Sequence, residues 1–420
     1  MLQQGKFSAD IVYFYGEDSN LTAIFHNSAP DIPAGYNFDY INADALIHEL
    51  SVSNGRLVTK SGMSYRVLVL DKYSRHMSLP VLRAIHKLVE QGAVVAGEKP
   101  LDTPSLADDP AEFKRISDEL FGQGTTGMRA LSKGKVYVGQ NAAAALKAMN
   151  VAPDFDYAKP DNGPQILFIH RKLANGDLYF LDNRGDRGAT IDATFRVTGK
   201  APELWYSETG ETSPASYTIS NGRTTVPLHF EPWGTVFVAF LKPARQASLT
   251  LPPTTETQLA TVGGAWNVAF QPDRGAPASA TFDKLISWTD SSDKGIKYFS
   301  GKGTYTTALQ AAPNWFGKGA RLWIDLGDVK NLAVVTVNGK ELGTVWHAPY
   351  RVDATSALQP GANQISVQVI NSWVNRLIGD QQSDTTTKYT FTTWKTYKAD
   401  SPLLPSGLIG PVAVVRETSK

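Results

Sequence analysis

Four carboxylate side chains in the N-terminal quarter follow segments with the composition of buried β-strands. Glu17 and Asp18 follow ADIVYFYG, Asp71 ends SYRVLVLD, and Glu98 comes near the end of AVVAGE. Ligands of an open parallel sheet bind beyond the carboxyl ends of the strands. Hydrolysis with inversion needs two carboxyl groups roughly 6.5–9.5 Å apart, one protonated and one able to activate water. These four residues are therefore candidates for catalysis.

Helix capping is the alternative role for the same carboxylates, and it is favoured over catalysis. Acidic residues between a strand and a helix commonly accept hydrogen bonds from the first backbone N–H groups of the helix and interact favourably with its dipole. Asp44, which lies just before ALIHEL, suits this role. Capping and catalysis both remain open for this set.

A second group of candidates suits sugar binding, and it lies in the segments VWHAPYR and NSWVNRLIGD. A sugar ring is recognised by an aromatic face together with a few convergent polar groups. The candidates are Trp346, His347, Arg351, Trp373, Asn375 and Arg376. The alternative is structural: Trp346 and Trp373 fill a β-sandwich core, and Arg376 pairs with Asp380 at the i, i+4 spacing of a helix.

Composition excludes several other function classes. The chain has 420 residues, 41 basic against 40 acidic residues and no cysteine. This balance does not favour nucleic acid or a membrane surface as a partner, and thiol catalysis is excluded. The motifs of serine hydrolases, zinc proteases and phosphate loops do not occur. No cofactor is required, although calcium is left open because DRGAP and DSSDKG offer oxygen ligands.

Strand-like and helix-like segments alternate over residues 1–158, which predicts a parallel α/β sheet. The clearest helix is LPVLRAIHKLVEQG, whose apolar residues follow the i, i+3, i+4, i+7 pattern, with Pro80 at its start and Gly92 just past its end. A chain of this length is expected to form two or three domains.

The remainder of the chain is predicted to be all β. Residues 159–245 suggest a small antiparallel β-sandwich with hairpin turns at Asn175-Gly176 and Asn221-Gly222. Residues 246–258, rich in Pro and Thr, are predicted to be a linker. Residues 259–420 are predicted to form a jelly roll. The predicted fold class is therefore multidomain, α/β plus all-β.

Several segments resemble one enzyme family. The run from ARLWIDLGDV through NSWVNRLIGD, closed by SPLLPSGLIGPVAVV, is similar to the galactose-binding-like jelly roll of large glycoside hydrolases. Together with GYNFDYINADAL, the stretch VLVLDKYSRHMSLPVLRAIHKLVEQGAVVAGEKP and HRKLANGDLYFLDNR, nearly the whole chain resembles the C-terminal part of glycoside hydrolase family 106, the bacterial α-L-rhamnosidases.

This resemblance implies that residues 1–158 form a glutamine-amidotransferase-like domain, without the cysteine nucleophile usual for that fold. It also implies that a catalytic (β/α)8 barrel precedes the segment matching Met1, so that Met1 is an internal methionine. The family's catalytic carboxylates and calcium ligands belong to that barrel, and no residue here inherits them. A bacterial periplasmic or secreted location is implied as well.

The expected function is therefore that of an accessory portion, structural or sugar-binding, of an α-L-rhamnosidase-like glycoside hydrolase. Its expected partners are carbohydrate and either a catalytic barrel or a second copy of the chain, with MLQQGKF as a candidate contact. The alternative is a self-standing glycoside hydrolase that uses the strand-end carboxylates.

Overall fold

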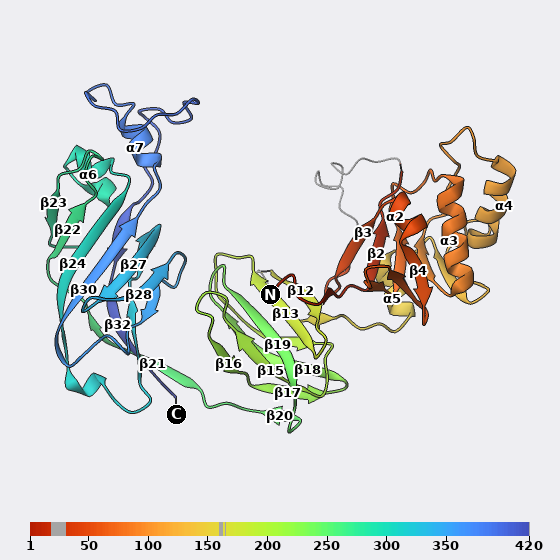
Figure 1. Cartoon of the computed structure of the whole chain (residues 1–420), viewed down its shortest axis with the longest axis horizontal. Helices are drawn as coiled ribbons and strands as arrows, with labels where there is room; N and C mark the ends of the chain where they lie inside the picture. Colours follow the sequence, from red (N-terminus) through yellow and green to blue (C-terminus); the bar gives the residue numbers. More distant parts are fainter. Residues whose placement is uncertain (18–30, 159–162, 164, 420) are drawn as a thin grey trace. The chain divides into compact units, whose positions relative to one another are not determined.

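The computed structural model describes residues 1–17, 31–158, 163 and 165–419. The chain divides into two compact units, Met1–Leu251 (unit 1) and Pro252–Lys420 (unit 2). Unit 1 contains both the α/β part and the small sandwich (Figure 1). The candidate Asp18 lies outside the described residues.

A six-stranded sheet forms the centre of the α/β part, in the order β3-β2-β7-β8-β10-β9. The strands are β2 (Ile11–Phe14), β3 (Phe38–Ile41), β7 (Val67–Leu70), β8 (Val94–Gly97), β9 (Gly127–Leu131) and β10 (Gly134–Val138). All neighbours pair in parallel except β9, which forms an antiparallel edge. The predicted parallel α/β sheet is confirmed, and its strand order reverses at β2, between β3 and β7.

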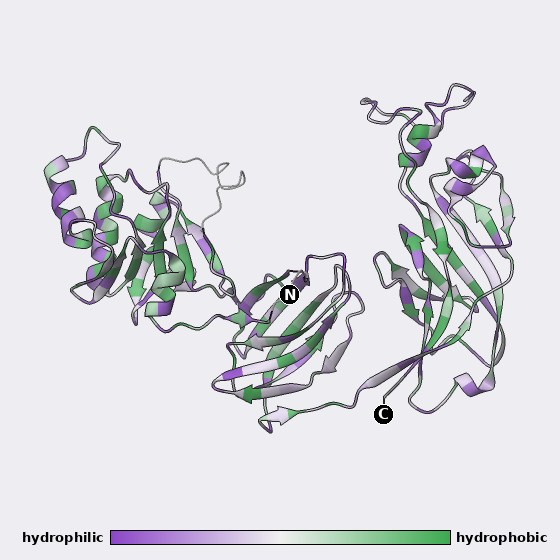
Figure 2. Ribbon diagram, turned by 180° about the vertical axis from the view of Figure 1, so that it is seen from behind, coloured by the Kyte–Doolittle hydropathy of each residue, from purple (hydrophilic) through white to green (hydrophobic). Residues whose placement is uncertain are grey.

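Helices cover both faces of this sheet. They are α2 (Ala43–His48), α3 (Leu79–Gln91), α4 (Pro110–Phe121) and α5 (Ala142–Ala148). Residues of α2, α3 and α4 share one core with alternate strand residues, and α5 packs in a separate core with the others. Figure 2 shows hydrophobic residues gathered along the strands and hydrophilic residues on the outer sides of the helices.

The predicted helix α3 is confirmed. Pro80 lies in its first turn, and Gly92 ends it in the left-handed conformation, with φ of 115°. All of its large aliphatic residues are buried: Leu79, Val81, Leu82, Ile85, Leu88 and Val89. A three-stranded sheet that lies between α2 and β7 in sequence, not among the predicted elements, is formed by β4 (Leu50–Ser53), β5 (Arg56–Thr59) and β6 (Ser64–Tyr65).

The predicted antiparallel sandwich is also present, built from two sheets. One has the order β1-β12-β13-β19-β15-β16 and the other β11-β14-β18-β17-β20. The strands are β1 (Lys6–Phe7), β11 (Phe155–Asp156), β12 (Ile166–Lys172), β13 (Asp177–Asn183), β14 (Ala189–Phe195), β15 (Lys200–Trp205), β16 (Thr212–Pro214), β17 (Tyr217–Ser220), β18 (Arg223–Phe230), β19 (Thr235–Pro243) and β20 (Ser248–Leu249).

Two strands correct the predicted boundary at residue 158. Strand β1 pairs with β12, and β11 pairs with β14, so both ends of the segment assigned to the α/β domain belong to the sandwich sheets. Backbone groups at a sheet edge find partners wherever an open edge lies close, and proximity of this kind does not follow from local sequence patterns.

The two predicted hairpins form, but only one uses the expected turn. Asn221 and Gly222 have φ of 49° and 73°, as a type I′ turn requires. Asn175 and Gly176 have no positive φ, and residues 173–176 form a longer loop between β12 and β13. Glycine is needed at 176 for a different reason: a Cβ there would lie 2.1 Å from the carbonyl oxygen of Phe240.

The predicted linker, residues 246–258, is largely structured. Strand β20 pairs with β17, and β21 (Thr254–Thr261) pairs with β32 (Ala413–Ser419). Thr and Ser suit exposed strands as well as linkers, so composition alone did not distinguish the two. The two units meet in sequence between Leu251 and Pro252.

Unit 2 is built mainly from antiparallel sheets, with the orders β21-β32-β25-β29 and β23-β22-β24-β30-β27-β28 and the short pair β26-β31. The remaining strands are β22 (Trp266–Phe270), β23 (Ser279–Phe282), β24 (Lys302–Ala311), β25 (Arg321–Asp325), β26 (Asp328–Lys330), β27 (Leu332–Val337), β28 (Lys340–Val345), β29 (Arg351–Asp353), β30 (Gly361–Ile370) and β31 (Gly407–Gly410). Its helices are α6 (Lys294–Lys297), α7 (Val374–Gly379) and the 3-10 turns Trp288–Asp290 and Pro313–Trp315. Among the described helices of the chain, none has the length and apolar character needed to cross a bilayer.

Candidate functional site

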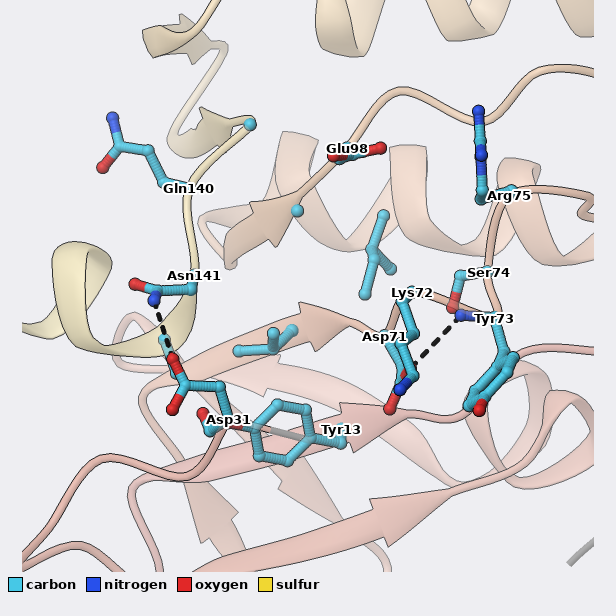
Figure 3. A pocket seen from close by; sticks show the side chains of 15 residues that line it. Tyr13, Asp31, Asp71, Lys72, Tyr73, Ser74, Arg75, Glu98, Gln140 and Asn141 are labelled. Carbon is cyan, nitrogen blue, oxygen red and sulfur yellow. Dashed lines mark hydrogen bonds between the residues drawn. The ribbon is translucent and has the colours of Figure 1, made fainter. Parts of the chain in front are cut away.

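A cleft of about 720 Å³ opens at the carboxyl ends of β2, β7, β8 and β10 (Figure 3). We call it the switch-point cleft, because it lies where the strand order reverses, the usual ligand position in open α/β sheets. Its polar and charged lining residues are Tyr13, Asp31, Asp71, Lys72, Tyr73, Ser74, Arg75, Glu98, Gln140 and Asn141.

Asp71 and Glu98, two of the predicted carboxylates, both line this cleft. Asp71 follows β7 and is buried, and its Oδ1 accepts a hydrogen bond of 3.2 Å from the backbone N–H of Tyr73. Burial raises the pKa of Asp71 above its ordinary value, against the opposing effect of this hydrogen bond. A carboxyl whose pKa is raised by burial keeps its proton to a higher pH than an exposed carboxyl does.

Glu98 reaches the cleft because Gly97 ends β8 in close contact with β7. Gly97 has φ of 143°, and a Cβ there would lie 2.7 Å from the Cβ of Leu70. A larger residue at position 97 would push the two strand ends apart. Asp71 and Glu98 therefore follow two adjacent strands, and Figure 3 shows both among the residues that line the cleft.

Eight of these polar lining residues were not among the predicted site residues, and three of the eight are joined by hydrogen bonds. The Tyr13 hydroxyl donates to the backbone oxygen of Asp31 at 3.0 Å, and Asn141 Nδ2 donates to Asp31 Oδ2 at 3.1 Å. Asn141 also caps α5 by accepting from the Ala144 N–H. A sequence signal existed for Asn141 alone, since it stands between the strand-like GKVYVG and the helical AAAALKA.

Glu17 serves as a cap. Its two carboxylate oxygens accept from the backbone N–H of Ser78 at 2.7 Å and from the Ser78 hydroxyl at 2.9 Å, at the start of α3. Asp108 Oδ2 accepts from the N–H of Leu79. Two carboxylates distant in sequence therefore cap α3, which supports the capping alternative for Glu17.

The expectation that Asp44 caps the helix at ALIHEL is wrong. Asn42 is the N-cap of α2, and its side-chain oxygen accepts from the N–H of Ala45 at 2.8 Å. Asp44 lies within the first turn and contacts His48 one turn further along. The helix begins two residues earlier than its apolar residues indicated.

In unit 2, the sequence candidates Trp346 and Trp373 lie on the surface. Their side chains are 63% and 73% exposed, so the alternative that they fill the sandwich core is wrong. Trp346 follows β28 and Trp373 follows β30, and both strands pair with β27. Val345 lies opposite Ala333 and Ile370 opposite Leu332, which places both tryptophans beyond the same end of this sheet.

Asn375 and Arg376 lie beneath this surface. The predicted pair of Arg376 with Asp380 is confirmed, with 2.9 Å between Nε and Oδ1, and both side chains are buried. Asn375 Nδ2 donates to the carbonyl of Leu404 at 2.7 Å. Both residues thus organise the segment around α7 from within.

His347 directly follows Trp346 in sequence, and Arg351 lies five positions after Trp346. The His347 ring lies 5.1 Å from the Trp346 ring, edge to face. The Arg351 guanidinium lies 4.9 Å from the ring of Trp323 and pairs with Glu256 at 2.8 Å. Arg351 is therefore held by contacts within unit 2.

Comparison with known proteins assigns the family. The profile of glycoside hydrolase family 106, described as alpha-L-rhamnosidase, matches residues 1–219. The chain belongs to this family. Residues 289–400 of this family-106 chain match a second profile, a galactose-binding-like domain of glycosyl hydrolase family 2.

Two relatives match this family-106 chain over nearly its whole length. The structure of a rhamnosidase from Novosphingobium sp. PP1Y is 44% identical, with a TM-score of 0.90 over 99% of this chain and 39% of that one. A putative beta-glucuronidase from Formosa agariphila is 24% identical, over 99% of this chain and 56% of that protein. The chain therefore spans 39% and 56% of the lengths of these relatives.

Metal binding by this family-106 chain remains a prediction. Among the described residues, no group of three or more His, Asp or Glu side chains is arranged to hold a metal ion. In DSSDKG, Asp293 caps α6 by accepting from the N–H of Ile296 at 3.1 Å. This bond occupies one of the oxygens that the motif could offer to calcium.

Proposed function

We propose that the chain is an accessory, carbohydrate-associated portion of a larger α-L-rhamnosidase-like glycoside hydrolase, and that it contacts saccharides through Trp346 and Trp373. The observation that supports this most strongly is the exposure of both indoles at one end of one sheet. We also propose a glutamine-amidotransferase-like fold for the α/β part and a jelly roll for unit 2.

Exposed indoles are suited to this role. The face of an indole packs against the C–H surface of a sugar ring, and its N–H can hydrogen-bond at the edge of the contact. Large aromatic side chains left in water on a soluble protein indicate a binding surface when they gather together. Two such rings beyond one sheet end are therefore a candidate surface for contact with a saccharide.

Titration of the chain with a rhamnose-containing oligosaccharide, followed by calorimetry, tests this function. We expect Trp346→Ala and Trp373→Ala each to weaken binding by about tenfold while folding is retained, since loss of an aromatic platform removes roughly 1–2 kcal/mol. Trp233→Ala is the matched control, because Trp233 is 56% exposed but lies in unit 1. Equal affinity for all three variants and the wild type would reject the proposed site.

A second candidate function is hydrolysis by the chain itself, favoured by the burial that raises the pKa of Asp71 in the cleft that Glu98 also lines. A panel of aryl glycosides, including α-L-rhamnoside and β-galactoside, with and without calcium, tests it. The accessory function predicts no turnover. Turnover that is lost in both Asp71→Asn and Glu98→Gln would instead establish the cleft as catalytic.

We further propose that the exposed N-terminal segment contacts a catalytic barrel or a second copy of the chain. Met1 and Leu2 are exposed apolar residues, next to strand β1. Replacing both by Ser is expected to leave the fold intact and to weaken such a contact, measurable by sedimentation with and without the remaining portion of the enzyme.

A further inference from the structure

A second cleft of unit 1, of about 790 Å³, lies between the sandwich and the three-stranded sheet β4-β5-β6. We call it the basic cleft. Strands β1, β12 and β13 contribute one wall, and β5 and β6 contribute the other. It shares no lining residue with the switch-point cleft.

The acidic residues of the basic cleft are all engaged in close pairs. Asp10 is buried and accepts from Arg66 Nε at 2.8 Å and from Arg196 Nη2 at 2.7 Å. Asp154 and Asp177 lie 2.7 Å and 3.0 Å from the two ring nitrogens of His170. The negative charge of this cleft is therefore matched by the side chains around it.

The basic residues exceed the acidic ones, by five to three, before His170 is counted. The five are Lys6, Arg56, Arg66, Lys172 and Arg196. Within the described part of the chain, Arg56 donates to Ser64, from Nε to the hydroxyl at 2.7 Å and from Nη2 to the carbonyl at 3.2 Å. Among the residues that the structure describes, no carboxylate lies within salt-bridge distance of Arg56 or Lys6, and Arg66 contacts Asp10 through Nε alone.

Among the described residues that line this cleft, the cationic side chains outnumber the carboxylates. Arg56 is partly buried and lies close enough to Arg66 and Arg196 that burial and the charge of Arg66 lower its pKa. Like charges held together in partial burial oppose folding, and a bound oxyanion would reverse that effect. Guanidinium groups match the planar geometry of carboxylate and the oxygens of sulfate.

We propose that the basic cleft binds an acidic saccharide, with its carboxylate or sulfate group on Arg56, Arg66 and Lys6. The oxyanion half of this proposal rests on the cleft alone. The saccharide half rests on the carbohydrate-associated function proposed above, and on the lining itself, because Phe7 and Leu173 offer apolar surface and Ser8 and Ser64 offer hydroxyls. The volume lies within the range of small-molecule sites.

Calorimetric titration of the full chain at constant ionic strength tests the proposal. The probes are methyl β-D-glucuronide, glucose 6-sulfate, the neutral methyl β-D-glucoside and sodium acetate. We expect one of the charged sugars to bind about tenfold or more tightly than both the glucoside and acetate. The double variant Arg56→Gln, Lys6→Gln should weaken that binding by about tenfold or more, since it removes two charge-assisted contacts.

Lys60→Gln is the matched control, because Lys60 follows β5 but lies outside the cleft lining and should change the affinity by less than about twofold. Equal binding of charged and neutral sugars, or unchanged binding in the double variant, would overturn the proposal. Acetate binding as tightly as the charged sugars would overturn its saccharide half. Trp346→Ala should leave this binding unchanged, which separates it from the proposed neutral-saccharide site.

Discussion

The buried charges of Arg376 and Asp380 hold the segment that follows α7. Arg376 is 6% and Asp380 2% exposed, and their salt bridge closes one helical turn. The second carboxylate oxygen of Asp380 accepts from the backbone N–H groups of Tyr389 and Thr390 and from the Thr390 hydroxyl, at 2.6–2.9 Å. One carboxylate therefore joins the helix to the chain ten residues later.

Arg376→Met should destabilise unit 2 by about 3–5 kcal/mol, because it leaves a buried carboxylate without its cation. Denaturant unfolding followed by tryptophan fluorescence measures the change. The control is Lys294→Met, which breaks the exposed pair with Asp384. It should leave the transition unchanged, and equal effects of both substitutions would contradict the importance of burial.

Asp71 is a candidate catalytic residue, and its ionisation also affects the stability of the folded chain. Its pKa in the folded chain is raised by burial, so the folded state holds the proton more tightly than the unfolded state does. The contribution of Asp71 to stability is therefore fully present below the unfolded pKa, near 3.8, and is lost as the pH rises through the folded pKa.

Asp71→Asn removes this ionisation while its side-chain oxygen can still accept from the Tyr73 N–H. We expect a higher melting temperature than the wild type at pH 7 and a difference that shrinks toward pH 3.5 or below. Calorimetry across this pH range measures it. A variant less stable at pH 7 would show that the carboxylate itself is needed for folding.

At the scale of elements, α3 depends on contacts from distant segments at its N-terminus. Ser78, its N-cap, makes no side-chain capping bond of its own, and Glu17 and Asp108 supply the acceptors. Thr103 donates to Asp108 as well, and the Leu79 N–H and this hydroxyl lower the pKa of Asp108.

Glu17→Ala should reduce the stability of unit 1 by about 1 kcal/mol, the usual effect of losing a cap. Urea unfolding measures it. Glu90→Ala, in the last turn of the same helix, should have no effect or a small stabilising one, because a negative charge there opposes the helix dipole. An unchanged unfolding midpoint for Glu17→Ala would contradict the capping role, and catalysis would again be a candidate role for this residue.

His170 joins three elements of the sandwich: β12, β13 and the segment before β11. Burial by itself lowers the pKa of His170, but hydrogen bonds with Asp154 and Asp177 outweigh burial and raise it above the ordinary 6.5. Burial raises the pKa of Asp154, and its hydrogen bond with His170 reverses this, so the pKa lies below 3.8. Tyr179 stacks on the ring at 4.0 Å.

These directions predict a window of pH for the stability of unit 1. The histidine contribution is complete below pH 6.5 and is lost as the pH rises through the folded pKa of His170. The carboxylate contribution is complete above pH 3.8 and is lost as the pH falls through the folded pKa of Asp154. The free energy of unfolding of unit 1, measured with urea, should therefore decrease as the pH rises above 6.5. His170→Gln should make this decrease with pH smaller. An equal decrease in the variant and the wild type would contradict this account.

At the scale of the whole molecule, the two units have separate hydrophobic cores. Trp266 and Trp288 are the largest fully buried side chains of unit 2, while Tyr13 and Tyr179 are among the largest of unit 1. Units with independent cores are expected to unfold in separate transitions.

Scanning calorimetry of the full chain should therefore resolve two transitions. Leu82→Ala should lower the transition temperature of unit 1 only, and Leu326→Ala that of unit 2 only. Each substitution should reduce the free energy of unfolding of its unit by about 2–5 kcal/mol, since both leucines are fully buried. A joint shift of both transitions by either substitution would indicate a single cooperative unit.

Features that depend on neighbours along the chain could be predicted from the residue order. Helix α3 with its Pro80 and Gly92, the turn at Asn221-Gly222 and the pair of Arg376 with Asp380 all follow from periodicity, from positive φ or from the spacing of one helical turn. The parallel sheet and its strand-end carboxylates followed as well, because alternation of strands and helices constrains the topology.

Features that depend on distant partners became visible only in the folded chain. It made Glu17 a cap for α3, brought Asp71 and Glu98 to one cleft and left Trp346 and Trp373 in solvent. Asp10 meets Arg196 across 186 positions of sequence. Local patterns record which residue types a segment prefers to bury or cap, whereas the partner that a side chain meets is set by which chain segments pack together when the cores form.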